Sequence, residues 1–420
     1  MTAYDVLVVG AGPAGLAAAQ AAAASGALVA IVDDNPHAGG QIWRGGPERQ
    51  ADARAAALWA ALRAAPNVRW LPATRVLYAP APGQLRVQTS SGASTLYYGR
   101  LILATGARER LLPFPGWTLP GVTGAGGLQA LAKGGYPVAG KRVVVAGSGP
   151  LLLAVAATLK GSGAHIVAII EQAPLRSLLA FAAGLAATPS KAVQALRLGA
   201  QLNGIDYLHH SHVRAAHGDG VLQSVQVQRG QRREPDILHC DFLACGYGLL
   251  PNLELAQALG CATATADGQT VVHTDDWQQT SISGIYCAGE GTGIGGVDLA
   301  LTEGRIAGLA ASGQASQLDA VIAQRRRWKK FAARLARAFT LRPELATLAG
   351  DDTIVCRCED VRHGELRPHA SWRSAKLQTR CGMGPCQGRV CGGATEVLYG
   401  WRPDAVRMPI APARVDTLIA

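Results

Sequence analysis

Two stretches of the chain repeat one pattern of apolar and polar positions. In the first, the apolar run Val6–Val9 is short and β-branched enough to be a buried strand. Residues 14–24 are almost all alanine and predict a helix, and the apolar run 28–32 predicts a second buried strand that ends at Asp33. The pattern therefore predicts a strand–helix–strand unit of a parallel sheet.

Three glycines, Gly10, Gly12 and Gly15, join the first strand to the helix in G-x-G-x-x-G spacing. The first makes a tight turn, the second lets the backbone approach a pyrophosphate, and the third lets helix and strand pack closely. The pyrophosphate would lie at the helix N-terminus, where free N–H groups favour negative charge. Asp33, 23 residues after Gly10, would accept from a ribose hydroxyl. A simple tight turn is the alternative, but strands, helix and acid in register favour a dinucleotide site.

The pattern returns over residues 142–171, with an apolar run, a turn at Gly147 and Gly149, a helix, and a second run that ends at Glu171. Glu171 would favour NAD over NADP, because a carboxylate repels a 2′-phosphate. However, Leu152 stands at the third glycine position and would keep the helix further from the strand. A retained fold that binds nothing is therefore the alternative to a nicotinamide site.

Two further segments resemble flavoprotein motifs. Ala104, Thr105 and Gly106 follow a buried strand and resemble the A-T-G motif of flavoproteins with two dinucleotide-binding domains, where the chain passes close to the nucleotide. The segment T-S-I-S-G-I-Y-C-A-G-E, which ends at Gly289 and Glu290, resembles the last flavin motif of that class. In that motif the acid, usually Asp, accepts from a ribityl hydroxyl. Here the acid is Glu290, whose side chain is one methylene longer.

Composition indicates a globular chain, with 49% hydrophobic and 16% charged residues among 420. No apolar run reaches the roughly 18 residues that a membrane span needs, and the N-terminus enters a core strand directly, so we expect neither a membrane span nor a signal peptide. The expected location is the cytoplasm, with peripheral attachment to the inner membrane left open. Residues 323–339 carry seven of the 40 Lys and Arg residues and no acid. This local charge predicts a basic amphipathic helix between two domains rather than nucleic-acid binding; partner docking and a membrane surface remain open.

Nine cysteines are unevenly distributed, with none before Cys240 and five in the last quarter of the chain. In a reducing compartment such a cluster indicates a metal site rather than disulfides. The expected ligands are Cys356, Cys358, Cys381 and Cys386. The C-x-C pair is uncommon in zinc modules, and four thiolates can hold a [2Fe–2S] cluster; zinc and free thiols are the alternatives. The arrangement resembles cluster domains of the bacterioferritin-associated ferredoxin type. Cys391 would lie on a helix starting near Gln387 and serve packing.

Several motifs together resemble one family along nearly the whole chain: GAGPAG, GGQIWR, ATGARER, FPGWTLPGV, GSGPLLL, GIYCAGEGTGIGG, TEGRIAG, TIVCRCEDV and RCGMGPCQGR. The family is the α (A) subunit of bacterial opine oxidases, with D-hydroxyproline dehydrogenase α and the B subunit of hydrogen cyanide synthase as relatives, and sarcosine oxidase α as a more distant one. The resemblance implies a partner β subunit with a D-amino-acid-oxidase-like fold that oxidises a secondary amine, such as an opine or D-hydroxyproline, with a small γ subunit in some complexes. It also implies FAD on this chain (NAD or ATP in some relatives), FMN at the interface with β in several members, and electron transfer through the cluster to a quinone or another acceptor.

We therefore predict an α/β chain with two Rossmann-like dinucleotide-binding domains, one inserted in the other, and a small α-rich [2Fe–2S] domain. The expected boundaries are 1–118 with 271–312, the insert 119–270, a basic helical linker 313–350, the cluster domain 351–400 and a tail 401–420. The expected cofactor-binding residues are Gly10, Gly12, Pro13, Ala14, Gly15, Asp33, Asp34, Gly40, Gln41, Ala104, Thr105, Gly106, Gly147, Gly149, Glu171, Gly289 and Glu290. No catalytic residue is expected on this chain, because no segment is left over for a substrate-binding domain.

Two other functions remain open at this point. A stand-alone NADH-dependent flavoprotein reductase would need a working nicotinamide site in the second unit. A non-catalytic scaffold would hold ATP or NAD in the first site for structural purposes only. A redox disulfide near the first flavin helix is excluded, because no cysteine precedes Cys240.

Overall fold

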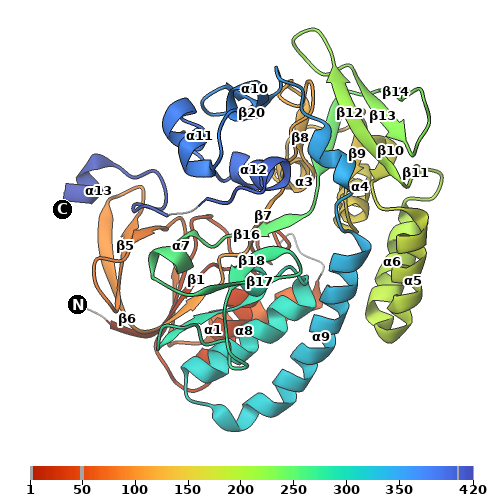
Figure 1. Cartoon of the computed structure of the whole chain (residues 1–420). Coiled ribbons are helices and arrows are strands. Elements are labelled where there is room, and N and C mark those ends of the chain that lie inside the picture. The colour runs from red at the N-terminus through yellow and green to blue at the C-terminus, as the bar shows by residue number, and fades with distance from the viewer. Residues whose placement is uncertain (1–2, 48–51, 404–405, 420) are drawn as a thin grey trace. The chain divides into compact units, whose positions relative to one another are not determined.

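The computed structural model describes residues 3–47, 52–403 and 406–419. The chain forms two compact units of mixed α/β structure, and Figure 1 labels many of their elements. The first unit comprises Met1–Arg108, Leu250–Ala333 and Ala405–Ala420, and the second comprises Glu109–Leu249 and Arg334–Asp404. The predicted α/β class with two Rossmann-type units is confirmed.

A seven-stranded sheet forms the centre of the first unit. Its strands are β1 (Ala3–Val9), β2 (Val29–Val32), β3 (Val68–Leu71), β4 (Arg75–Tyr78), β5 (Gln84–Gln88), β6 (Ala93–Leu103) and β19 (Ile285–Cys287). The order is β3-β2-β1-β6-β5-β4, and β19 also pairs with β6. β1, β2, β3 and β19 join the sheet in parallel, whereas β4, β5 and the first half of β6 are antiparallel. The parallel strands end at one edge, which is where such sheets bind nucleotides.

The first unit's other elements cover this sheet or extend it. They are α1 (Pro13–Ala23), α2 (Ala53–Ala64), α7 (Glu254–Ala258), β17 (Thr263–Ala266), β18 (Gln269–Val272), α8 (Val297–Ala311) and α13 (Val415–Ile419). Two short strands, β7 (Ala107–Glu109) and β16 (Leu249–Pro251), and the long helix α9 (Leu318–Ala338) contain the points where the chain passes from one unit to the other.

The alanine-rich composition of α1 has a packing reason. A Cβ atom at Gly304 of α8 would lie 2.1 Å from the carbonyl oxygen of Ala14, and one at Gly308 would lie 2.2 Å from that of Ala18. The two helices, neighbours in Figure 1, therefore approach so closely that only small side chains fit between them. The small side chains serve this contact, and they leave the start of α1 close to the loop that follows β19.

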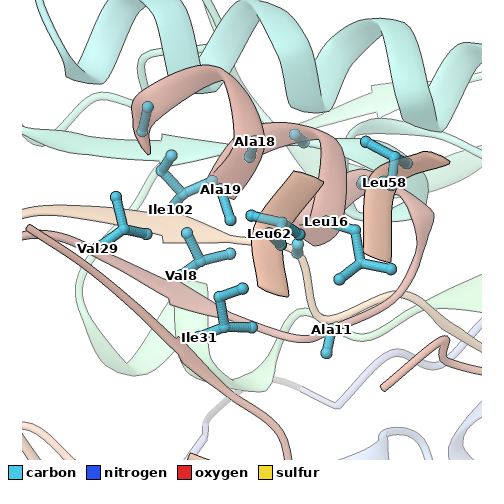
Figure 2. Close-up of a cluster of buried hydrophobic side chains, with 14 of the residues drawn as sticks. Val8, Ala11, Leu16, Ala18, Ala19, Val29, Ile31, Leu58, Leu62 and Ile102 are labelled. Atoms are coloured by element: carbon cyan, nitrogen blue, oxygen red, sulfur yellow. The ribbon is translucent and has the colours of Figure 1, made fainter. Parts of the chain in front are cut away.

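Side chains from β1, β2 and β6 meet those of α1 and α2 in the largest core cluster of this unit. Figure 2 shows Val8 and Ile31 from the strands facing Leu16 of α1 and Leu62 of α2. α2 begins at Ala53, where the Asp52 side chain accepts from the Arg54 N–H and caps the helix. Asp and Asn are preferred at this position because their oxygens satisfy free N–H groups.

The second unit contains a five-stranded parallel sheet of order β11-β10-β9-β15-β8. Its strands are β8 (Val122–Gly124), β9 (Arg142–Gly147), β10 (His165–Glu171), β11 (Asp206–Leu208) and β15 (Phe242–Gly246). A three-stranded antiparallel sheet consists of β12 (Ser211–His217), β13 (Ser224–Arg229) and β14 (Asp236–His239). The helices before residue 210 are α3 (Ala125–Lys133), α4 (Leu151–Gly161), α5 (Leu175–Gly184) and α6 (Pro189–Gln201). The predicted strand, glycine turn and helix at 142–161 correspond to β9 and α4.

The C-terminal part of the second unit has a small core of its own. Its elements are β20 (Ile354–Cys356), β21 (Val361–Arg362), α10 (His363–Leu366), α11 (Trp372–Thr379) and α12 (Cys391–Tyr399). The helix expected from Gln387 begins only at Cys391, because Gln387 has a positive φ of 52°, which an α-helix cannot contain. Across the described residues of the whole chain, no helix has the length and apolarity to cross a membrane.

Candidate functional site

The three glycines in the loop of the first unit, Gly10, Gly12 and Gly15, differ in the space around them. A Cβ at Gly10, where φ is +106°, would lie 2.2 Å from the Ala104 carbonyl oxygen, and one at Gly15 would lie 1.8 Å from the Gly10 carbonyl oxygen. Both glycines are therefore required by the fold. Gly12 has an ordinary φ of −76°, and its Cβ would meet nothing closer than the Cα of Gly40 at 3.9 Å. The space beside Gly12 at the start of α1 is thus a cradle that a side chain would fill, as a pyrophosphate site requires.

A second glycine segment adjoins this loop. The N–H of Gly39 donates to the Ala11 carbonyl at 2.7 Å, and a Cβ at Gly40 would lie 3.0 Å from the Cα of Gly12. Gly40 is therefore brought to the cradle, as expected. Gln41 is exposed, and its side-chain oxygen accepts from Arg44 at 3.1 Å.

Asp33 at the end of β2 organises the same loop. Its Oδ2 accepts from the Ala11 N–H at 2.7 Å, and its Oδ1 accepts from the Asn35 N–H at 2.8 Å. The residue is half-buried, and a carboxylate oxygen has a second lone pair for a ribose hydroxyl. Asp34 is exposed and lies 3.8 Å from the Arg75 guanidinium.

The A-T-G turn is held by a residue that sequence reasoning missed. Thr105 donates through Oγ1 to the Asn252 carbonyl at 2.8 Å, and the Asn252 side chain donates back to the Thr105 carbonyl at 2.9 Å. The Asn252 N–H also donates to the Gly106 carbonyl at 3.0 Å. Ala104 continues from β6 by donating to the Val9 carbonyl at 2.8 Å. The only sequence signal for a role of Asn252 in this turn was the proline that precedes it.

Glu290 lies in a short 3₁₀ turn, Gly289–Thr292, after β19. Its Oε1 accepts from the Gly296 N–H at 3.1 Å, whereas its Oε2 is buried and has no hydrogen-bond partner among the described residues. Burial raises the pKa of the Glu290 carboxyl to about 7, against backbone hydrogen bonds that lower it. An unpaired buried carboxyl oxygen is costly, and a ligand hydroxyl would satisfy it. The first site therefore fits a dinucleotide at two independent points, Gly12 and Glu290.

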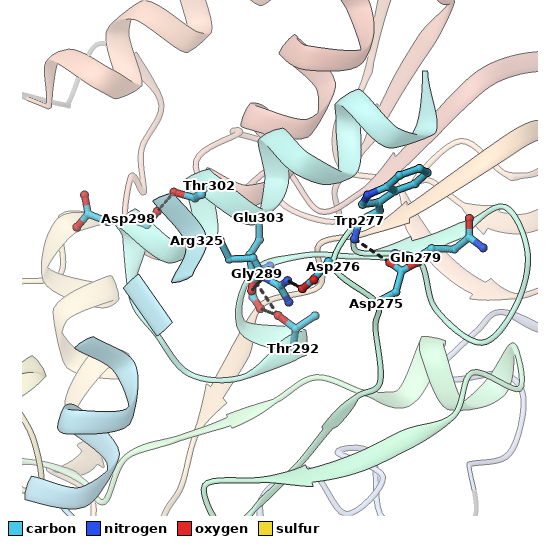
Figure 3. Close-up of polar contacts among 10 residues, drawn as sticks. All are labelled: Asp275, Asp276, Trp277, Gln279, Gly289, Thr292, Asp298, Thr302, Glu303 and Arg325. Atoms are coloured by element: carbon cyan, nitrogen blue, oxygen red, sulfur yellow. Dashed lines mark hydrogen bonds and ion pairs between the residues drawn. The ribbon is translucent and has the colours of Figure 1, made fainter. Parts of the chain in front are cut away.

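A buried ion pair supports the turn that carries Glu290, and Figure 3 shows its members. Glu303 of α8 accepts from the Gly289 N–H at 3.1 Å and from the Thr292 hydroxyl at 2.6 Å. Arg325 of α9 donates to Glu303 at 3.2 Å and to Asp276 at 3.1 Å. Glu303 is 0% and Arg325 4% exposed.

The signal for this pair in the sequence is weak, because both residues lie in helices whose charged positions were expected at the surface. Among the described residues of α9, Arg325 is the only basic one that is buried. Glu303 is the corresponding acid on the buried face of α8. The only sequence signal for the ion pair was that Glu303 and Arg325 each occupy a position on the apolar face of their helix.

The corresponding acid of the second unit is already fully engaged. Glu171 is 0% exposed; its Oε2 accepts from the Gly149 N–H at 2.7 Å and its Oε1 from the Ala173 N–H at 2.9 Å. Burial raises the pKa of Glu171 to about 7. Gly147, at φ +136°, has no room for a Cβ, which would lie 1.7 Å from the Gly246 carbonyl oxygen. The turn keeps the fold of a dinucleotide site, and its acid makes the same two kinds of backbone contact as Asp33, but it is completely buried where Asp33 is half-buried.

The cysteines of the C-terminal segment form two neighbouring groups. The sulfurs of Cys356, Cys381 and Cys391 all lie within 4.8 Å of one another and are buried. Cys391 was expected to serve packing apart from the ligands, but α12 begins at this residue, so its thiol enters the group. Of the four expected ligands, the structure thus brings Cys356 and Cys381 together and adds Cys391 to them.

The other two expected ligands, Cys358 and Cys386, lie against each other beside this group. Cys358 is exposed and Cys386 half-buried; the backbone N–H of Cys386 donates to the Cys358 sulfur, and the Cys358 thiol donates to the Cys386 sulfur. A Cβ at Gly384 would lie 2.2 Å from the Cβ of Cys358, so the glycine loop wraps closely around it.

The environment of the buried group suits an anionic metal centre. Hydrogen bonds from the thiols of Cys381 and Cys391, and from the N–H groups of Gly382 and Cys358, lower the pKa of Cys356. Gly382 and Gly388 are held against the Trp372 ring, where a Cβ at Gly382 would lie 2.6 Å from a ring carbon. Sulfur donors with N–H groups directed at them fit iron or zinc.

Comparison with known proteins shows which families the chain is similar to. The sequence model of the family described as pyridine nucleotide-disulphide oxidoreductase matches residues 4–309. The A subunit of opine oxidase from Rhizobium meliloti (strain 1021) is 36% identical over 423 residues, which cover 93% of this chain and 91% of that one. The HcnB subunit of hydrogen cyanide synthase from Pseudomonas aeruginosa is 32% identical over 420 residues, which cover 92% and 90%.

Two solved structures are similar in fold. L-proline dehydrogenase from P. horikoshii superposes with a TM-score of 0.71 at 20% identity, covering 99% of this chain and 79% of that one. T. acidophilum thioredoxin reductase gives 0.55 at 22% identity, covering 76% and 100%. From the sequence model and the near full-length relatives, the chain belongs to the pyridine nucleotide-disulphide oxidoreductase family and, within it, to the group that contains the opine oxidase A subunits.

Proposed function

We propose that this chain is the nucleotide-binding and electron-transferring subunit of a multisubunit flavin-dependent amine dehydrogenase. The observation that carries the proposal is the presence on one chain of a dinucleotide site with an unfilled cradle at Gly12 and a buried group of cysteines. Two relatives of similar length are named as subunits, one of opine oxidase and one of hydrogen cyanide synthase, which supports a partner chain here.

The ligand of the first site is FAD in this proposal. Gly12 and the N-terminus of α1 would receive the pyrophosphate, Asp33 the adenosine ribose, and the free Oε2 of Glu290 a ribityl hydroxyl. The remaining contacts of the expected set come from Pro13, Ala14, Gly40, Ala104, Thr105 and Gly106. Bound FAD supplies two-electron redox chemistry, and this chain's own residues orient it and satisfy its polar groups. NAD or ATP would use the same cradle, and the absorption spectrum of the bound ligand distinguishes them.

The cysteines would hold a [2Fe–2S] cluster, which supplies one-electron transfer. Cys356 and Cys381 belong both to the ligand set expected from sequence and to the buried group. Cys358 would be the third ligand, and either Cys386 or Cys391 the fourth. The exposed position of Cys358 would give electrons a route to an acceptor outside the chain, for which a quinone is the proposed class.

Amine oxidation itself would take place on the partner β subunit, with a D-amino-acid-oxidase-like fold and its own FAD, and with FMN at the interface of the two chains. The substrate would be a secondary amine such as an opine or D-hydroxyproline. The CH–NH group of the amine loses two electrons and two protons. The electrons would reach the quinone through this chain. A small γ subunit would complete the complex.

The test is to purify the complex from its native source through a tag on this chain, and to compare it with a complex carrying Cys356→Ser. The proposal expects a flavoprotein partner, substrate-dependent bleaching of its flavin in a single turnover in both complexes, and quinone reduction only in the first. Rapid NADH-dependent dye reduction by the chain alone, or equal quinone reduction by both complexes, would contradict it.

A further inference from the structure

Residues 339–342, which follow α9, run across the glycine turn of the second dinucleotide-binding unit and are here called the closing segment. Ser148 in the turn donates through Oγ to the Phe339 carbonyl at 3.2 Å. Gln172, directly after Glu171, donates to the Thr340 carbonyl at 3.1 Å. The segment therefore lies at the carboxyl ends of β9 and β10, the place where sheets of this kind bind nucleotides.

Hydrogen bonds join the closing segment to the two residues that follow β9 and β10, Ser148 and Gln172. The Arg342 N–H donates to the Gln172 side-chain oxygen at 3.1 Å, and the Arg342 guanidinium donates to the Gln172 carbonyl at 3.2 Å. Gln172 also donates to the Ser148 hydroxyl at 3.0 Å. Gln172 is 0% and Ser148 6% exposed, so these polar groups are satisfied by the chain itself.

Apolar contacts hold the closing segment at both ends. The Phe339 ring meets Phe181 of α5 edge-on, with the ring centroids 5.3 Å apart. Leu345, just beyond the segment, is 1% exposed and belongs to the core cluster of the second unit, and Leu341 packs against the same cluster. Displacing the segment would therefore expose apolar surface as well as break hydrogen bonds.

The first unit of the same chain provides an internal comparison. Asp33, the acid at the end of β2, remains half-buried beside an open cradle. Glu171, its counterpart at the end of β10, accepts from two backbone N–H groups as Asp33 does, but it is 0% exposed. No heavy atom of the described chain would touch a Cβ at Gly149, so the second site is closed at its ribose end and not at its pyrophosphate end.

From these contacts we infer that the closing segment takes the place of the adenosine ribose, so that the second unit binds no nicotinamide dinucleotide. The family to which the chain belongs is named for pyridine nucleotides, but the residues of this unit do not fit one. Leu152 agrees, because it replaces the third glycine and is buried in the core of the unit. The unit then serves as a support for the C-terminal segment, and electrons do not enter this chain from NADH through it. The inference holds whichever ligand the first site carries.

Hydrogen–deuterium exchange of the full chain, with and without NADH at about 1 mM, the upper end of ordinary Michaelis constants, tests the inference. The amide of Arg342 should be protected in both samples, and NADH should leave exchange at residues 147–152 and 171–173 unchanged. Protection by NADH confined to residues 10–15 would assign it to the first site and support the inference. Slower exchange at residues 147–152 with NADH, or rapid exchange of residues 339–342 without it, would overturn the inference.

Gln172→Ala supplies the second arm, with Gln228→Ala as its control. Gln228 of β13 also donates to two backbone carbonyls of the same unit, those of Gly230 and Arg232, but far from the closing segment in the chain. Gln172→Ala removes three hydrogen bonds of the segment region, so exchange at residues 339–342 should rise about tenfold or more while β9 stays protected. Gln228→Ala should leave that exchange unchanged. Equal protection of residues 339–342 in both variants would contradict the assigned contacts.

Discussion

At the scale of single residues, the three glycines of the first loop do different work. Gly10 and Gly15 are required by steric contacts within the protein, whereas Gly12 is required only by a ligand that would lie beside it. The same distinction applies to carboxyl oxygens, because Oε1 of Glu290 is satisfied by the protein and Oε2 has no partner among the described residues. Two positions can therefore be changed to separate binding from folding.

Gly12→Val should abolish nucleotide binding while the unliganded chain keeps most of its stability, because the side chain would enter the cradle at a Cβ position whose nearest protein atom is 3.9 Å away. The measurement is bound nucleotide per chain, together with chemical unfolding of the ligand-free protein. Gly15→Ala is the matched control, in which the added Cβ would collide with the Gly10 carbonyl and unfold the first unit. Full nucleotide content in Gly12→Val would show that the ligand does not approach this position.

Glu290→Gln should change the pH dependence of stability in the ligand-free chain. Burial raises the pKa of Glu290 from 4.5 to about 7, so the folded state holds a proton that the unfolded state loses. The unfolded state then binds fewer protons between pH 4.5 and 7, and the free energy of unfolding falls as pH rises through that range. The free energy of unfolding should fall by at most about 3 kcal/mol over this range, because one pKa unit corresponds to about 1.4 kcal/mol. Glu290→Gln should lack this part of the slope in urea unfolding at pH 5 and 7.5; identical slopes would contradict the raised pKa.

At the scale of elements, α9 contributes to the first site through one buried residue rather than through its exposed charge. Arg325 pairs with Glu303, and Glu303 holds the Gly289–Thr292 turn. Arg327, an exposed basic residue of the same helix, is not among the hydrogen-bond partners of this network. The helix, which was expected to connect two domains, also supports the turn that carries Glu290.

Arg325→Met should destabilise the first unit by about 3–5 kcal/mol, because it leaves the Glu303 carboxylate buried without its cation. Bound nucleotide should fall as well, since the turn loses its support. Arg327→Met, an exposed change on the same helix, should alter neither by a measurable amount. The double variant Arg325→Met with Glu303→Leu should recover part of the lost stability in the same unfolding assay; no recovery would argue against the pair.

At the scale of the whole molecule, our proposals combine a dinucleotide site in the first unit, a second unit closed to NADH, and the cysteines of the C-terminal segment. This combination suits a subunit that passes electrons on and does not collect them from NADH. The position still to be assigned is the fourth cluster ligand, because sequence spacing favours Cys386 and the buried group favours Cys391.

Serine substitutions of the cysteines decide between these two positions. Cys356→Ser and Cys381→Ser should each abolish the visible absorption and the reduced-state EPR signal of anaerobically purified chain, because serine oxygen is a harder and poorer donor to iron. Of Cys386→Ser and Cys391→Ser, the one that keeps the signal identifies the thiol that is not a ligand. Zinc in place of iron by elemental analysis would remove the electron-transfer role, and a signal retained in Cys356→Ser would show that the cluster is elsewhere.

The sequence alone determined the features that depend on neighbouring residues. The glycine roles at 10–15, the strands that end at Asp33 and Glu171, and the cysteine-rich segment follow from local sterics and spacing, which a linear pattern records. Only the tertiary structure decided the contacts of residues far apart in the chain. Gln172 and Arg342 are 170 positions apart, and the two acids that end their strands look alike until the fold leaves one open and seals the other. The burial of Arg325, unlike that of its exposed neighbours, was also decided by tertiary structure, because it depends on which elements pack against the helix.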